Sequence, residues 1–156
     1  MNNGRVKKTD KMLVPILMAD DDESDRVLTR HAFEESCIAN PFYFVRDGEE
    51  LMEFLHRRGA YCNALDAPRP GLILLDLNMP RKNGWEALQE IKADASLCHI
   101  PVVVLTTSQQ KEDVLRSYDL GVNSFIIKPV KFDQLVQIAR CIGRYWLEIG
   151  TLPPAI

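Results

Sequence analysis

The stretch Leu72–Asp76 (LILLD) constrains the fold more than any other part of the chain. Four consecutive aliphatic residues end at a single aspartate, and turn formers flank them, Pro70 and Gly71 before and Pro80 and Gly84 after. A short apolar run bounded in this way is typical of a strand buried on both faces of a parallel sheet. Asp76 would lie at the carboxyl end of that strand, where open α/β sheets bind ligands. Taken alone, Asp76 is equally consistent with a cap on the next helix.

Similar apolar runs recur along the chain and alternate with segments of helical period. Strands are expected at 15–19, 42–45, 102–105 and 124–127, in addition to the one that ends at Asp76. Helices are expected to begin at Glu23 or Ser24, after Asp47-Gly48 and after Gly84, and to span 112–120 and about 132–147. The stretch 58–70 has no clear period and is expected to be a longer loop. Five strands alternating with five helices predict a parallel sheet with helices on both faces.

Length and composition predict one domain. With 156 residues, the chain is long enough to bury a substantial core, and we divide it into a charged leader (1–12), a domain (13–149) and a tail (150–156). The residues are 46% hydrophobic and 26% charged with a net charge of −3, which argues against a general binder of nucleic acid or membrane surfaces. The leader lacks the apolar core of a signal peptide, and no apolar run approaches membrane-spanning length. We therefore expect a cytoplasmic protein.

The four cysteines do not suggest a metal site. Cys37, Cys62, Cys98 and Cys141 are scattered, with no CxxC pair and no histidine at ligand spacing. This pattern argues against zinc and favours reduced thiols.

Polar residues of complementary chemistry stand at the ends of four expected strands. Asp20–Asp22 follow the first strand, Asp76 the third, Thr106 the fourth and Lys128 the fifth. In a parallel sheet these ends lie on one edge, where converging carboxylates repel one another unless some protonate or a cation enters. Oxygen ligands with open positions suit a hard divalent ion, so the sequence predicts an Mg²⁺ site.

The same edge has the groups that a phosphoryl group requires. The Thr106 hydroxyl and the Lys128 ammonium could bind phosphoryl oxygens, and Asp76 is the candidate nucleophile for an aspartyl phosphate. Each residue also has a plainer explanation: the aspartate run could be a solvated turn or helix cap, the threonine structural, and Lys-Pro a turn dipeptide. Their joint occurrence at successive strand ends favours the functional interpretation.

These residues resemble the receiver domains of two-component response regulators, which have the flavodoxin-like fold of chemotaxis-type signalling. The resemblance extends over about residues 12–147 and implies a doubly wound five-stranded parallel sheet, a (βα)5 domain with strand order 2-1-3-4-5. Within the motif LLDLNMPRKNG, it implies that Asp76 accepts the phosphoryl group of a histidine kinase. It also implies that Asp20 and Asp21 hold Mg²⁺ together with Asp76 and the backbone carbonyl of Asn78.

Further roles follow from the same resemblance. Thr106 would be the switch hydroxyl, Phe125 the switch aromatic residue, and Lys128 the phosphate-binding lysine, joined to Pro129 by a cis peptide bond. Phe125 has no hydroxyl and could report the switch only through its burial.

Three other positions bear on the resemblance. Lys131 stands where the family often has an aspartate or serine, which predicts a weak cap on the last helix. Asn78 and Ser108 lie where family members tune the lifetime of the phosphoryl group.

A finer resemblance is to the stand-alone regulators paired with cyanobacterial and bacterial phytochrome kinases. It rests on the long loop before the third strand and on the segments VVVLTTS, SYDLGVNSFI, Tyr145–Leu147 and Thr151–Pro153. The implied partner is a phytochrome-type histidine kinase, and with no output domain in view the signal would leave by protein contact. The chain would not be an enzyme beyond Mg²⁺-dependent self-phosphorylation and slow autodephosphorylation.

Apolar residues continue past Ile142, where the core face of the last helix should end. One explanation is that the tail folds back on its own domain and covers Trp146. The other is a symmetric homodimer through the tail and the face formed by 112–120, 124–127 and 132–147.

Two other functions fit part of this pattern. A phosphohydrolase of the haloacid-dehalogenase type also uses a strand-end aspartate and Mg²⁺, but it needs a second acid two residues later. Asn78 stands there and cannot protonate a leaving group. The other alternative is an unphosphorylated adaptor that keeps only the fold. The intact set of Asp21, Asp76, Thr106 and Lys128 argues against it.

Overall fold

Five parallel strands form the centre of the molecule. The computed structural model describes residues 13–154, so the expected leader at 1–12 lies outside the described residues. The strands are β1 (Ile16–Ala19), β2 (Phe42–Val45), β3 (Leu72–Leu75), β4 (Val102–Thr106) and β5 (Ser124–Ile127). They are ordered β2-β1-β3-β4-β5 and all pairs are parallel. The predicted doubly wound sheet and its strand order are therefore confirmed.

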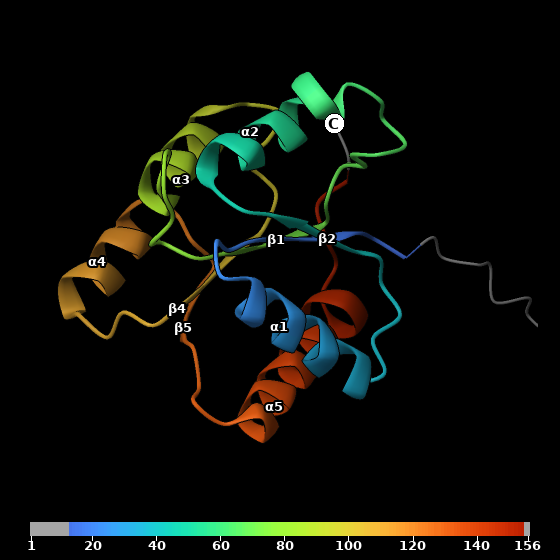
Figure 1. Ribbon diagram of the computed structural model, residues 1–156, viewed down its shortest axis with the longest axis vertical. Coiled ribbons are helices and arrows are strands. Elements are labelled where there is room, and N and C mark those ends of the chain that lie inside the picture. The colour runs from blue at the N-terminus through green and yellow to red at the C-terminus, as the bar shows by residue number, and fades with distance from the viewer. Residues whose placement is uncertain (1–12, 155–156) are drawn as a thin grey trace, which may run out of the picture.

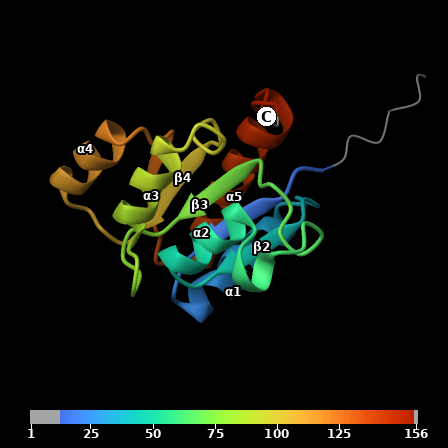
Figure 2. The same ribbon diagram turned by 90° about the horizontal axis from the view of Figure 1, so that it is seen from above.

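Helices cover both faces of this sheet (Figure 1). The first and last helices, α1 (Glu23–Glu35) and α5 (Phe132–Ile142), pack side by side on one face. The other face is covered by α2 (Gly48–His56), α3 (Gly84–Ala93) and α4 (Lys111–Asp119), as the view from above also shows (Figure 2). Within residues 13–154, no helix combines the length and apolar character that a membrane span requires.

The central strand β3 is buried on both faces, as its unbroken aliphatic run predicts. Leu72 and Leu74 pack into the cluster beneath α1 and α5, whereas Ile73 and Leu75 pack into the cluster beneath α2 and α3. All four side chains are at most 1% exposed. Since both faces need apolar side chains, the strand cannot show the alternation of a half-exposed one. Packing on both faces therefore fixes the position of β3, and with it the position of Asp76 at its end.

Three helices begin with side-chain caps. The Asp22 carboxylate accepts a hydrogen bond from the Asp25 N–H at 3.1 Å, so the last aspartate of the run does cap α1. Asp47 caps α2 in the same way, and Asn83 begins α3 with a capping box. By contrast, Lys131 precedes α5 without a side-chain cap, which confirms the expected weak start of that helix.

Two segments differ in detail from expectation. The 58–70 loop contains a short 3₁₀ turn, Gly59–Tyr61. The last helix is α-helical only to Ile142, after which the chain continues in a wider π-helical turn, Gly143–Ile149. That turn brings Trp146 into contact with the α1–α5 core cluster, while Tyr145 and Ile149 remain exposed. Trp146 is therefore partly buried against its own domain, in agreement with the fold-back alternative, and the homodimer stays a prediction.

A close contact joins the turn after β2 to the loop after β3. The Gly48 N–H donates to the Lys82 carbonyl at 2.8 Å, and a Cβ added at Gly48 would lie 2.2 Å from that same oxygen. Only glycine allows the two backbones to approach this closely. The contact fixes the position of the loop that follows Asp76.

We predict that Gly48→Ala lowers the free energy of unfolding by about 3 kcal/mol, because the added methyl group forces two backbone segments apart. Urea denaturation measures the loss. Gly59→Ala is the matched control: its Cβ would have room, at 3.6 Å from the nearest side-chain atom, and only its positive φ opposes alanine. That control should lose about 1 kcal/mol. Equal losses at the two glycines would contradict the steric explanation.

Candidate functional site

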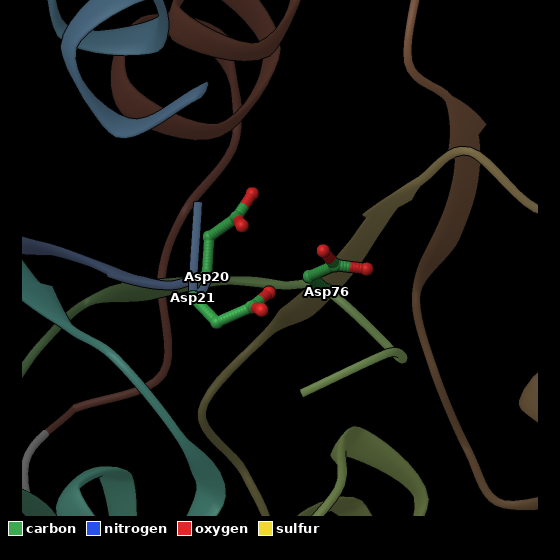
Figure 3. A group of neighbouring side chains, drawn as sticks. All are labelled: Asp20, Asp21 and Asp76. Carbon is green, nitrogen blue, oxygen red and sulfur yellow. The ribbon is translucent and has the colours of Figure 1, made fainter. Parts of the chain in front are cut away.

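The carboxyl ends of the strands bring the predicted site residues to one edge of the sheet. Asp20 follows β1, Asp76 follows β3, Thr106 ends β4 and Lys128 follows β5. Carboxylate oxygens of Asp20, Asp21 and Asp76 lie within 4.8 Å of one another. Figure 3 shows the first two leaving the end of β1 and the third leaving the end of β3. Adjacent parallel strands therefore place three carboxylates at one point, as the sequence predicted.

Lys128 is the cation of this cluster. Its Nζ donates to Asp20 Oδ2 at 2.6 Å, to Asp25 Oδ2 at 2.8 Å and to Asp76 Oδ2 at 3.2 Å. Only 11% of the lysine side chain is exposed, so its charge is poorly screened by water. The ammonium group therefore uses all three of its donors on carboxylates.

Asp25 is a site residue that sequence reasoning missed. It lies in the first turn of α1, where acidic residues commonly stabilise the positive end of a helix. From the sequence alone, Asp25 looks like any other acid in the first turn of a helix, and nothing sets it apart from Glu23. Only the path of α1 over the strand ends reveals that its side chain reaches Lys128.

Burial and charge set the protonation of the two central groups. Asp20 is fully buried, and burial raises the pKa of this carboxyl to about 6, although the hydrogen bonds from Lys128 and the Asp22 N–H act in the opposite direction. Burial tends to lower the pKa of Lys128, but its bonds to Asp20 and Asp25 and the charge of Asp76 raise it well above the usual value. The lysine thus stays charged throughout the physiological range.

Asp21 differs from its neighbours because its carboxylate is exposed and unengaged. Within the part of the chain that the structure describes, no hydrogen bond or ion pair reaches it. Both of its oxygens are therefore free to coordinate a cation. Three clustered carboxylates, one of them free, are a donor set that fits a hard divalent cation. Carboxylate oxygens do not favour soft metals.

The backbone around Asp76 is held closely. The Asn78 N–H donates to Asp76 Oδ1 at 3.2 Å, and the Asp76 N–H donates to the Ala19 carbonyl at 2.9 Å. A Cβ at Gly84 would lie 2.3 Å from the Asp76 carbonyl oxygen, so the start of α3 packs directly against the aspartate. The Asn78 contact found here involves its N–H, and the metal-binding role of its carbonyl stays a prediction.

Thr106 and Phe125 occupy the two strands beyond Asp76. Thr106 is fully buried, and its carbonyl accepts a hydrogen bond from the Lys128 N–H at 2.8 Å, which links the ends of β4 and β5. The Ser108 N–H donates to Thr106 Oγ1 at 3.5 Å, a long contact, while the Ser108 hydroxyl bonds to Asp113 in α4. Phe125 is half-buried against the α2–α3 cluster. Their switch roles stay predictions.

The predicted cis bond between Lys128 and Pro129 is wrong. Among residues 13–154 there is no cis peptide bond. The cis form was expected to aim the lysine at Asp76, but the long side chain already reaches three carboxylates from a trans backbone. The trans form is intrinsically favoured by about 0.5–1 kcal/mol for bonds that precede proline.

Comparison with known proteins agrees with this geometry. The family model for the response regulator receiver domain matches residues 16–140. Response regulator Rcp1 of Synechocystis sp. is 44% identical over 140 residues, which cover 90% of this chain and 93% of Rcp1.

Two solved structures are also similar. The phosphorylated cyanobacterial phytochrome response regulator RcpA has a TM-score of 0.84 and 44% identity, over 91% of this chain and 99% of RcpA. The Mn²⁺-bound form of Rcp1 has a TM-score of 0.81 and 42% identity, over 90% and 99% respectively.

We predict that Asp21→Asn weakens Mg²⁺ binding at least about tenfold, because the change removes a charge and a free ligand from the cluster; a tenfold loss corresponds to about 1.4 kcal/mol. The titration can be followed by the fluorescence of Trp85, which lies at the start of α3 beside the Asp76 loop. Asp22→Asn is the matched control, since asparagine caps a helix as well as aspartate does. Equal weakening by both variants would indicate a general charge effect and contradict the assignment.

Proposed function

Because this chain belongs to the response regulator receiver family, we propose that Asp76 accepts a phosphoryl group from the phosphohistidine of a histidine kinase and that the protein signals by contact with other proteins. The match to the family model and the similarity to Rcp1 confirm the family resemblance that was inferred from the sequence. The observation that supports the role of Asp76 is that it belongs to the carboxylate cluster and also contacts Lys128, whose Nζ lies 3.2 Å from Asp76 Oδ2.

The arrangement suits an in-line transfer onto a carboxylate oxygen. An incoming phosphoryl group carries negative charge on its oxygens, and catalysis of such a transfer depends on position and charge stabilisation. Lys128, kept cationic by its neighbours, supplies one positive charge, and the Thr106 hydroxyl at the adjacent strand end can donate to another oxygen. Mg²⁺, when held by Asp20, Asp21 and Asp76 with the Asn78 carbonyl, would neutralise the charge that Lys128 leaves uncompensated.

The response to the new charge would be carried by β4, α4 and β5. Thr106 and Lys128 move onto the phosphoryl oxygens and Phe125 moves inward, which changes the face formed by α4, β5 and α5. Two features support α4 as the mobile part. It buries only Ser117 among its nine residues, and its start at Gln110 has no side-chain cap. The hydrogen bond from Ser108 to Asp113 connects the Thr106 loop to this helix.

The kinase is proposed to be of the phytochrome type, because the similar structure RcpA is a cyanobacterial phytochrome response regulator. A docking surface lies beside the site. Leu28 on α1 and Val130 and Phe132 after β5 are exposed apolar residues that line one cavity of ≈ 100 Å³ with Lys128. A partner that covers this patch would bring its donor group close to Asp76.

The protein is a signalling protein, and we propose that it does no chemistry beyond its own phosphorylation and slow dephosphorylation. Asn78, two residues after Asp76, offers an amide in place of the acid that a phosphohydrolase needs. Ordinary composition and a net charge of −3 argue against nucleic acid or membrane partners, and we propose that the protein acts in the cytoplasm.

We further propose that the protein forms a symmetric homodimer. Large apolar side chains are exposed on α4 (Leu115, Tyr118), on β5 (Ile127) and on the π-helical turn (Tyr145, Ile149). These side chains remain exposed, whereas Trp146 is partly buried against its own domain. Isologous dimers are the commonest assemblies of soluble proteins, and such a face would link dimer formation to the state of α4.

We predict that Asp76→Asn abolishes labelling by acetyl phosphate, since an amide cannot form the acyl phosphate. Borohydride trapping followed by mass spectrometry locates the modified residue. Asp66→Asn, which alters an exposed loop aspartate, should label like the unaltered protein. Modification of Asp76→Asn at any other aspartate would refute the assignment.

We predict that Leu115→Asp and Ile149→Asp each weaken the dimer at least about tenfold, because each buries a charge in the interface. Sedimentation equilibrium at tens of micromolar protein measures the effect. Leu65→Asp is the matched control: Leu65 is 85% exposed and belongs to the 58–70 loop, whose residues are not part of the proposed face. A full-length chain that is monomeric with and without a phosphoryl mimic would exclude the dimer.

A further inference from the structure

Lys128 is bound by one carboxylate that the predicted metal site does not use. Of its three partners, Asp20 and Asp76 belong to the cluster of possible cation ligands, and Asp25 does not. The Asp25 contact, at 2.8 Å, is shorter than the 3.2 Å contact to Asp76. Asp25 therefore lies outside the metal cluster but holds the Lys128 ammonium group at close hydrogen-bond distance.

The position of Asp25 is fixed by its own helix. Its N–H donates to the Asp22 carboxylate that caps α1, so its backbone is held at the first turn. Its side chain is 36% exposed, and the lysine that it contacts is only 11% exposed. A contact in which one member is nearly buried and the other is anchored differs from an exposed pair of two flexible side chains, which contributes little.

A cation bound at the cluster changes the partners available to Lys128. Such a cation would share the carboxylates of Asp20 and Asp76 with the ammonium, and its positive charge close to Lys128 would weaken both of those contacts. Lysine has a flexible four-carbon side chain, and without a fixed partner its ammonium samples many positions. Asp25 is the remaining carboxylate that can hold it.

We propose that Asp25 is a positioning residue, which keeps the Lys128 ammonium beside Asp76 while the metal engages Asp20 and Asp76. The inference rests on the proposed phosphorylation of Asp76. Positioning of this kind matters because a phosphoryl transfer depends on charges that are already in place when the new oxygens arrive.

Asp25 also has a simpler structural role, which a control must separate. Acids in the first turn stabilise a helix through its dipole, and Glu23 shares that role with Asp25. Within the described residues, however, only Asp25 of the two contacts Lys128. Glu23→Gln therefore makes the same change of charge in the same helical turn without touching the lysine.

The first experiment compares Asp25→Asn, Asp25→Glu and Glu23→Gln with the unaltered full chain. Phosphorylation by acetyl phosphate is measured at saturating Mg²⁺, and the Mg²⁺ dissociation constant is measured separately by Trp85 fluorescence. We expect Asp25→Asn to slow the maximal rate at least about fivefold while the dissociation constant changes less than about twofold. Asp25→Glu, which keeps the carboxylate, should recover part of the rate. Glu23→Gln should react like the unaltered protein.

A second measurement is independent of phosphorylation. In the presence of Mg²⁺, the rate at which an amine-specific reagent labels Lys128 is followed by mass spectrometry. Loss of the Asp25 carboxylate should free the ammonium group and raise that rate several-fold, whereas Glu23→Gln should not alter it. Labelling of an exposed lysine, Lys111, serves as the internal standard.

The outcomes distinguish the two levels of the proposal. If the unaltered protein is not phosphorylated at Asp76, the proposed function itself fails. If it is phosphorylated and Asp25→Asn reacts at the same rate, only the positioning role is refuted. The role is also refuted if Glu23→Gln slows the reaction equally, or if the Lys128 labelling rate is the same in all variants.

Discussion

The structure depends on the electrostatic balance at the carboxyl edge of the sheet. Three carboxylates, those of Asp20, Asp25 and Asp76, bind the ammonium group of Lys128, and a fourth, that of Asp21, lies beside Asp20 and Asp76. Two unit charges 4 Å apart interact by about 4 kcal/mol at the effective dielectric near a protein surface, so each unbalanced pair is costly. One lysine cannot neutralise four acids. The excess of negative charge favours the binding of a divalent cation. It also means that an added phosphoryl charge would change the electrostatic energy of the whole site.

Such a balance requires a rigid frame, and the sheet supplies it. β1, β3 and β4 are buried along their whole length, and the strand ends that carry Asp20, Asp76 and Thr106 cannot move without disturbing the core. The elements on the far side of β4 are held less firmly. β5 is only partly buried, and α4 buries a single serine. We therefore expect a change of charge at the site to move α4 and β5 more easily than the buried strands.

The fold could be predicted because its signals are local. The unbroken aliphatic run of β3 indicates a parallel sheet, and the ends of β1, β3, β4 and β5 carry polar residues whose chemistry suits a phosphoryl and metal site. Asp25 was missed because an acid in the first turn has an ordinary explanation, and only tertiary packing shows that it reaches Lys128. The π-helical turn at 143–149 was missed because over seven residues an apolar pattern does not distinguish it from an α-helix. The cis bond before Pro129 was inferred from the family rather than from any residue of this chain.

The 58–70 loop leaves the C-terminal end of α2 and enters β3 at its first residue, so it lies at the opposite edge of the sheet from Asp76. Its central residues are exposed, and the flanking Ala67 and Pro70 anchor it to the core. Loop tips of this kind tolerate inserted sequence well, because closure entropy rises only slowly with length. A fluorescent or affinity tag placed near Leu65 would thus leave the phosphoacceptor edge of the sheet free, which makes this loop a practical place to label the protein for observation inside a cell.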